Sequence, residues 1–189
     1  MFQGFKQICD RYNIDSTWKC FSFEANPYTY MKSRNIYRNL ISDRYDLVHD
    51  NLAVSNGEGS VAVSCMTDVS DPYASQRSNT INVNDASEFL YRGADPDMQK
   101  TVWVKSLDLS EFLFNNVSVD DFVVVKMDIE GAEFDILESI IHSKAYLLID
   151  DLHCEFHEKF FKSEEEFSQR KSDYIKAFTD AGKKVEIWN

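Results

Sequence analysis

The chain has 189 residues and a formal net charge of -12 at pH 7. This length suits one domain with a hydrophobic core and is short for two. The 43% hydrophobic content, with only 6 glycines and 3 prolines, excludes a disordered or fibrous protein. The negative charge argues against nucleic acid as a ligand, because such binding depends on Lys and Arg at the phosphates. We therefore expect a single globular domain over residues 1–189.

The four cysteines are far apart and form no C-x-x-C pair: Cys9, Cys20, Cys65 and Cys154. Neither a zinc knuckle nor a disulfide framework is indicated, so we expect buried, reduced thiols. The N-terminal residues lack the apolar core of a signal peptide, and no stretch approaches 18 uninterrupted apolar residues. These features predict a cytoplasmic protein that does not associate with a membrane.

The first third of the chain alternates helical and extended patterns. Apolar residues at helical spacing predict an amphipathic helix over 2–12. Residues 18–26 are typical of a strand, and 27–42 of a helix that begins with proline. Two further runs, 46–55 and 60–66, flank the turn sequence Asn-Gly-Glu-Gly, which predicts a β-hairpin.

The remainder begins with a polar, irregular stretch, 67–100, which we interpret as a long loop or lid. The elements expected after it are a strand over 101–109, a short helix starting near Ser110, a fully buried strand over 121–128, a helix over 133–145, an apolar run at 146–150, a helix over 163–181 and a strand over 183–189. In the last helix, Ser163 and Glu166 form a capping-box pattern and Gly182 marks the end. Strands alternating with helices indicate an α/β domain with a mainly parallel sheet and helices on both faces.

Acidic side chains follow several of the expected strands. Ligands of open α/β sheets bind beyond the carboxyl ends of the strands, which is where Glu24 and Asp128 are expected. Glu24 suits the hydroxyls of a ribose, although an acid before a helix also favours the helix dipole. Asp128 precedes Glu130 and Gly131, where glycine lets the backbone pass close to a ligand. The alternative is that Asp128, Glu130 and Glu133 merely charge the first turn of the next helix.

The segment "HCEFH" offers a second kind of site. If it is extended, His153, Glu155 and His157 share one face and suit a metal ion, whereas a helical conformation would separate them. His157 could instead act as a general base, because the ordinary pKa of histidine is near neutral.

The order of these segments resembles the FkbM-type S-adenosylmethionine-dependent methyltransferases. The resemblance covers about residues 21–161 and is carried by "FSFEANP", "NLAVSN", "SLDLSEFL", "VKMDIEGAEFDIL" and "LHCEFHEKFF". It implies a doubly wound Rossmann-like methyltransferase sheet, mostly parallel with an antiparallel C-terminal strand. It also implies S-adenosyl-L-methionine as cofactor and O-methylation of a hydroxyl on a sugar or natural-product-like small molecule. Because the spacing of "HCEFH" is not a specific metal signature, we expect no metal ion in the site.

The same resemblance assigns roles to individual residues. Glu24 would contact the cofactor's ribose, with Asp50, Asn51 and Ala53 near the adenine. Asp128 and Glu130 would line the methyl-transfer site, where Asp128 also contacts the cofactor. Glu155 and His157 would flank the acceptor pocket, and Asp128 or His157 would take the hydroxyl proton.

One departure bears on activity. The family's first strand and glycine-rich turn are expected before the first helix, whereas this chain begins inside that helix, with Gly4 as the last trace of the turn. The expectation is an N-terminally truncated domain. Two alternatives follow the methyltransferase hypothesis: a catalytically inactive, methyltransferase-like interaction domain, and a divalent-metal-dependent hydrolase or transferase that uses Asp128, Glu155 and His157.

Overall fold

The computed structural model describes residues 2–41, 45–66 and 99–188, so residues 67–98 of the predicted lid lie outside the described residues. The helices are α1 (Phe2–Tyr12), α2 (Pro27–Ile41), α3 (Leu109–Asn116), α4 (Glu133–His142) and α5 (Glu164–Asp180), with 3-10 turns η3 (Ala145–Leu148) and η4 (Glu158–Phe160). The strands are β1 (Lys19–Phe23), β2 (Asp46–Asp50), β3 (Ala53–Ser55), β4 (Gly59–Met66), β5 (Gln99–Asp108), β6 (Val124–Met127), β7 (Asp151–Cys154) and β8 (Lys184–Ile187). This is a mixed α/β domain, and its predicted lid is two residues too long because β5 begins at Gln99.

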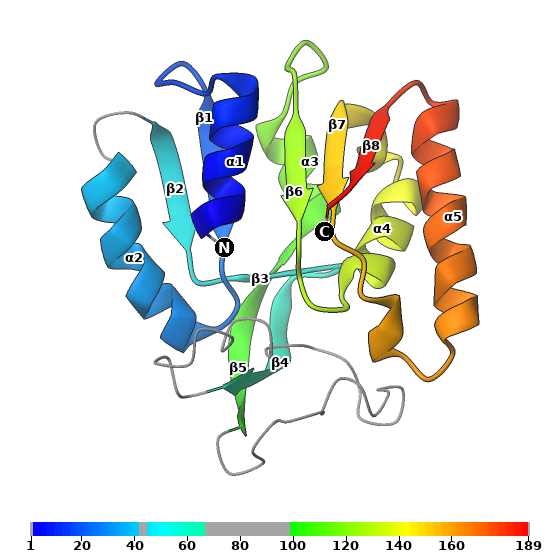
Figure 1. Cartoon of the computed structure of the whole chain (residues 1–189), viewed down its shortest axis with the longest axis horizontal. Coiled ribbons are helices and arrows are strands. Elements are labelled where there is room, and N and C mark those ends of the chain that lie inside the picture. Colours follow the sequence, from blue (N-terminus) through cyan, green and yellow to red (C-terminus); the bar gives the residue numbers. More distant parts are fainter. Residues whose placement is uncertain (1, 42–44, 67–98, 189) are drawn as a thin grey trace.

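The described strands form three small sheets (Figure 1). Strands β1 and β2 pair in parallel, and β6, β7 and β8 form a parallel sheet in that order. In the third sheet, β5 pairs in parallel with β3 and antiparallel with β4. The expected parallel pairing is confirmed for two of the sheets, whereas the single continuous sheet is replaced by three.

The predicted hairpin between β3 and β4 is wrong. Strand β5 lies between them, so the turn at Gly57 carries the chain across β5 instead of folding β4 back onto β3. Gly59 pairs with Ser106, and the Ser106 hydroxyl donates a hydrogen bond to the carbonyl of Gly57 at 2.9 Å. The long β5 offers β4 a partner at every residue from Gly59 to Met66, whereas β3 has three residues to offer.

The expected antiparallel C-terminal strand is also wrong. Strand β8 pairs in parallel with β7, from Lys184 opposite Asp151 to Ile187 opposite Cys154. The reason is that α5 crosses back between β7 and β8, so the chain enters both strands from the same end. Among the strands that the structure describes, the antiparallel one is β4.

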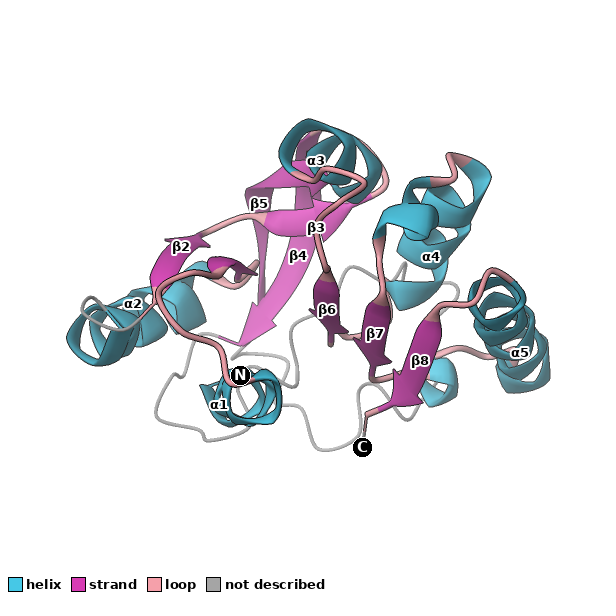
Figure 2. Cartoon of the chain, turned by 90° about the horizontal axis from the view of Figure 1, so that it is seen from above, coloured by secondary structure: helices cyan, strands magenta, loops and turns pink. Residues whose placement is uncertain are grey.

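Helices lie on both faces of the β6–β7–β8 sheet, as predicted. Helix α1 covers one face, and α3 and α4 lie on the other (Figure 2). Side chains alternate accordingly: Val124 packs with the α1 cluster, whereas Val125 and Met127 join the larger core with α4 and α5. Of the β6 residues, Met127 is buried and the others are partly exposed, so the fully buried strand expected here is only partly so.

The observed helix ends agree only in part with those predicted from the sequence. Asp108 caps α3, accepting hydrogen bonds from the backbone N–H of Ser110 and Glu111. Gly182 follows α5 at φ +74°, as expected, but the Ser163 side chain makes no capping hydrogen bond, so the capping box is wrong. Gly4 lies within α1 rather than in a loop, and a Cβ there would come within 2.8 Å of the Lys126 side chain.

The cysteine prediction is confirmed, since all four thiols are free and buried. Among the described residues, no helix has both the length and the apolar character needed to cross a membrane.

Candidate functional site

The carboxyl ends of β2, β6, β7 and β8 point to one side of the molecule (Figure 1). Glu24 follows β1, which runs parallel to β2, and Asp128 follows β6. Glu155 follows β7, and its backbone N–H donates to the carbonyl of Met127 at 2.9 Å. The topology therefore brings Glu24 and Glu155, which are 131 residues apart along the chain, to the same side of the molecule, although they follow strands of two different sheets.

The turn between β6 and α4 has an unusual backbone. Glu130 has φ +55° and Gly131 has φ +104°, conformations that L-residues other than glycine rarely adopt. The turn is held by Glu133, which is completely buried. Its Oε1 accepts a hydrogen bond from the N–H of Ile129, and its Oε2 accepts one from the N–H of Gly131, each at 2.9 Å. Glu133 thus fixes the direction in which Glu130 points.

Glu133 also orients His157. The Nδ1–H of His157 donates to Oε1 of Glu133 at 2.9 Å, which fixes the tautomer and directs Nε2 toward Glu130. Nε2 lies 3.6 Å from Oε2 of Glu130 and 3.9 Å from Oε1 of Glu155. Burial acts to lower the pKa of His157, but the hydrogen bond and charge of Glu133, together with Glu130, raise it to about 9. His157 is therefore a positively charged imidazolium at neutral pH when the site holds no other cation.

The surroundings of the Glu130 side chain disfavour its charged form. Its side chain is 14% exposed, and burial raises its pKa to about 8 against the opposing charge of His157. Asp128 lies nearby, with one oxygen 3.0 Å from the ammonium of Lys126. One potential ligand atom each from Asp128, Glu130 and His157 lies within 4.8 Å of the others.

The expected grouping of His153, Glu155 and His157 does not form. Strand β7 ends at Cys154, so the alternation on which that prediction depends stops before Glu155. His153 instead faces α1, where it is completely buried, with Nε2 2.8 Å from the Tyr12 hydroxyl. The site that does form, Asp128 with Glu130 and His157, shares only His157 with that prediction.

Glu24 is 7% exposed. Its Oε1 accepts a hydrogen bond from the N–H of Asn26 at 2.8 Å, while Oε2 has no hydrogen-bond partner among the described residues. Burial raises the pKa of Glu24 to about 7, and the charge of Asp128 adds to the shift. A buried acceptor without a donor suits a ligand that brings hydroxyl groups.

The other predicted cofactor residues lie beside Glu24 or in the core. The carbonyl of Asp50 accepts the N–H of Glu24 at 3.1 Å. The side-chain amide of Asn51 donates to the carbonyls of Glu24 at 2.7 Å and Ala25 at 3.2 Å, so it fixes the loop after β1. Ala53 is buried in the apolar cluster around β4 and β5, so its side chain packs in the protein interior.

Two important residues were missed at the level of sequence. Glu133 was interpreted as a helix-charging residue, although its position two residues after Gly131 is the spacing that lets it bind the turn's N–H groups. No sequence pattern indicates a role for Tyr12, because its hydrogen-bond partners on β7 are 139 or more residues away along the chain.

A family model described as "Methyltransferase FkbM domain" matches residues 7–182 of the chain. Comparisons with curated proteins and with solved structures gave no match. The matched range contains Glu24, the β6–α4 turn and His157.

Proposed function

The chain belongs to the methyltransferase FkbM domain family, and from that premise we propose that it is an S-adenosylmethionine-dependent methyltransferase acting on a hydroxyl of a small molecule. A sugar or natural-product-like compound is the proposed acceptor class. We further propose that its strands form the ligand edge of a doubly wound, Rossmann-like sheet. The observation that carries the proposal is the buried Glu24 carboxylate, which has an oxygen without a donor at the carboxyl end of β1.

The residues around Glu24 fit the cofactor proposed. A ribose has two neighbouring hydroxyls, and a carboxylate accepts hydrogen bonds from both. Asn51 holds the loop carbonyls of Glu24 and Ala25, so the carboxylate is positioned before any ligand arrives. Asp50, next to Asn51, is the neighbouring polar residue proposed for the adenine side.

The acceptor side of the proposed site is acidic. When bound, the cofactor supplies a methyl group on a sulfonium, which becomes a thioether as the acceptor oxygen forms its bond to the methyl carbon. The acceptor hydroxyl must lose its proton in this step. His157 is protonated at neutral pH because its pKa is about 9, so Asp128 is the proposed base. Glu155 and His157 border the proposed acceptor position.

Titration calorimetry with the demethylated cofactor, S-adenosylhomocysteine, tests the proposal without a known acceptor. We expect the wild-type protein to bind, and Glu24→Gln to bind at least about tenfold more weakly, because hydrogen bonds to a charged acceptor contribute about 1.5–3 kcal/mol. Glu58→Gln is the matched control, since Glu58 is exposed in the turn before β4. Absence of heat from the wild-type protein at millimolar ligand would contradict the proposal.

A further inference from the structure

We propose that Asp128, Glu130 and His157 together bind one divalent metal ion of the Mn²⁺ type. This departs from the sequence-based expectation, which placed no metal ion in the site. The binding itself follows from the geometry of the three side chains. The role suggested below for the ion, orienting the acceptor hydroxyl, rests on the proposed function.

The three side chains come from two segments that the sheet brings together. Asp128 and Glu130 lie in the turn after β6, and His157 lies three residues beyond the end of β7. Their candidate ligand atoms are within 4.8 Å of one another. Ligands that share an ion at about 2.1 Å lie no more than about 4.2 Å apart, so small side-chain rotations suffice.

His157 is held as metal-bound histidines are held. Its Nδ1–H is bound to the carboxylate of Glu133, and its Nε2 faces Glu130. A carboxylate on the far nitrogen fixes the tautomer and ring orientation and makes the ligating nitrogen more basic. Glu133 is itself fixed by the N–H groups of Ile129 and Gly131, so this support is rigid.

Glu130 provides a separate reason for a cation. Its carboxylate is mostly buried, yet among the described residues it accepts no hydrogen bond, and its nearest cation is His157 at 3.6 Å. A buried carboxylate without a donor is costly unless a water or an ion completes its environment. A divalent ion would do so, and two carboxylates with one imidazole suit Mn²⁺.

Acidic side chains outnumber basic ones around the three ligands. Four acids lie in this region, Asp128, Glu130, Glu133 and Glu155, whereas the basic side chains that pair with them among the described residues are Lys126 and His157. Lys126 uses one oxygen of Asp128, which leaves the other oxygen for a metal ion.

A metal ion here would act on the acceptor. A hydroxyl bound to a divalent ion becomes more acidic and is held in one orientation. With Asp128 acting as a ligand, Glu155 is the remaining carboxylate that can receive the hydroxyl proton. Its carboxylate lies 3.9 Å from Nε2 of His157, and its side chain is 37% exposed.

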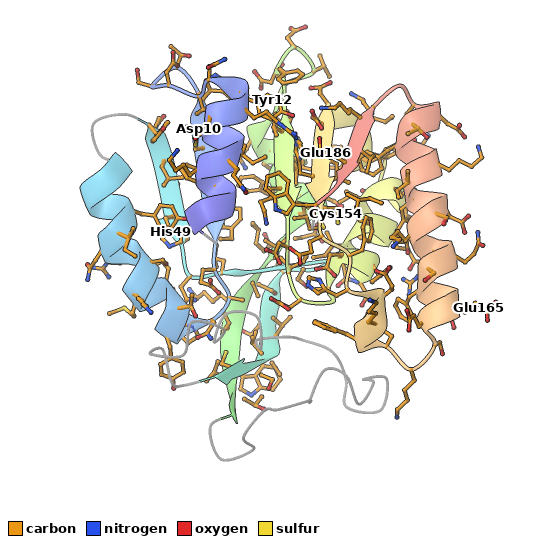
Figure 3. All side chains as sticks on the ribbon, in the orientation of Figure 1. Asp10, Tyr12, His49, Cys154, Glu165 and Glu186 are labelled. Atoms are coloured by element: carbon orange, nitrogen blue, oxygen red, sulfur yellow. The ribbon has the colours of Figure 1, made fainter. Side chains whose placement is uncertain are left out.

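The test is a titration of chelator-treated full-length protein with MnCl₂, in which electron paramagnetic resonance measures free Mn²⁺. We expect one bound Mn²⁺ per chain. We expect at least about tenfold weaker binding in Glu130→Gln and His157→Gln, and about 10- to 100-fold weaker binding in Glu133→Gln, whose residue supports His157. Glu165→Gln should bind as the wild-type protein does, because Glu165 projects from the outer side of α5 (Figure 3).

Two results would overturn the inference: no saturable binding, or equal binding in wild type and Glu130→Gln. If the variants fail to fold, NMR of the wild-type protein decides instead, because bound Mn²⁺ should broaden the imidazole signals of His157 before those of His142. Uniform broadening of both would count against the site. S-adenosylhomocysteine binding in the presence of EDTA separates the two proposals, because it would support the methyltransferase even if no Mn²⁺ binds.

Discussion

Among single residues, Glu133 connects the fold to the chemistry of the site. Its two oxygens bind two N–H groups of the β6–α4 turn, and Oε1 also binds His157. The same carboxylate therefore sets the backbone path at Glu130 and the direction of Nε2 in His157. Changing its charge should affect both.

Glu133→Gln should lower the pKa of His157 from about 9 toward the ordinary value near 6.5, because the largest contribution raising that pKa comes from Glu133. The variant should also lose about 1–3 kcal/mol of unfolding free energy, since an amide cannot accept at both ends. NMR titration of the imidazole signals measures the first effect, and urea unfolding the second. Glu138→Gln, on the exposed side of the same helix, should change neither the pKa nor the site; an unchanged pKa in Glu133→Gln would contradict this account.

Gly131→Ala should destabilise the protein by about 1–3 kcal/mol, because a side chain at φ +104° is strained whatever space surrounds it. The matched control is Gly57→Ala, since a Cβ at Gly57 has no neighbouring heavy atom within 4 Å. Urea unfolding of the two variants provides the comparison. Equal stabilities would mean that the turn relaxes without strain.

For single residues, the sequence predicts where a side chain lies relative to the strands better than it predicts which other residues the side chain contacts. Glu24 and Asp128 could be placed because an acid after an apolar strand lies at the ligand edge wherever the strand pairs. The Glu133–His157 hydrogen bond could not be predicted, because it depends on a left-handed backbone at Glu130, a residue that is not glycine. The proposed trio with His153 failed for a similar local reason, the end of β7 at Cys154.

Among the elements, α1 is joined to the sheet by a chain of polar contacts. Arg11 lies 3.3 Å from Nδ1 of His153, so Nδ1 accepts and Nε2 carries the proton that is donated to the Tyr12 hydroxyl. Tyr12 in turn donates to Asp151, and Arg11 pairs with Glu186 on β8 at 2.7 Å. A polar network that is buried at His153 and exposed at Arg11 and Glu186 in this way fixes one orientation of the helix on the sheet.

Tyr12→Phe should cost about 1–3 kcal/mol of unfolding free energy, because it removes the acceptor 2.8 Å from Nε2 of the buried His153 and leaves only the more distant Asp151 oxygen at 3.3 Å. The ring and its apolar contacts remain. Tyr30→Phe is the matched control, since that hydroxyl makes a weaker contact of 3.4 Å with the carbonyl of His49. Chemical unfolding should show a clearly larger loss for Tyr12→Phe, and equal losses would mean that the network does not hold α1.

The elements themselves could largely be predicted, whereas their pairing could not. The spacing of apolar residues and the residues typical of helix ends located α1, α3 and α5, because these patterns depend on neighbours within a few residues. The predicted partner of β4 was wrong because the Asn-Gly turn describes only the adjacent strands, whereas the partners of β4 on β5 lie 33 to 47 residues away along the chain. The capping box at Ser163 failed because the side chain does not turn toward the helix N–H groups.

At the scale of the whole molecule, several buried groups favour their protonated forms. Burial raises the pKa of Glu24 to about 7 and that of Glu130 to about 8; for His157 burial acts in the opposite direction, but its carboxylate neighbours raise the pKa to about 9. Each native-state pKa lies above the pKa of the same group in the unfolded chain. At any pH between the two pKa values of a group, the native state therefore binds more protons than the unfolded state. The unfolding free energy must therefore fall as pH rises through this range.

The unfolding free energy of the wild-type protein should decrease between pH 7 and 8.5, by at most about 1.4 kcal/mol per pH unit for each proton involved. His157→Gln should show a smaller slope. In the wild-type protein, His157 loses its proton near pH 6.5 when unfolded but keeps it to about pH 9 in the native state, and the variant lacks this difference. His49→Gln is the control: burial lowers the pKa of His49, so this residue is mostly neutral in both states above pH 7 and its removal changes the slope little. Urea unfolding at pH 7, 7.5, 8 and 8.5 in metal-free buffer measures the slopes, and identical slopes for wild type and His157→Gln would show that Glu133 and Glu130 do not hold a proton on His157.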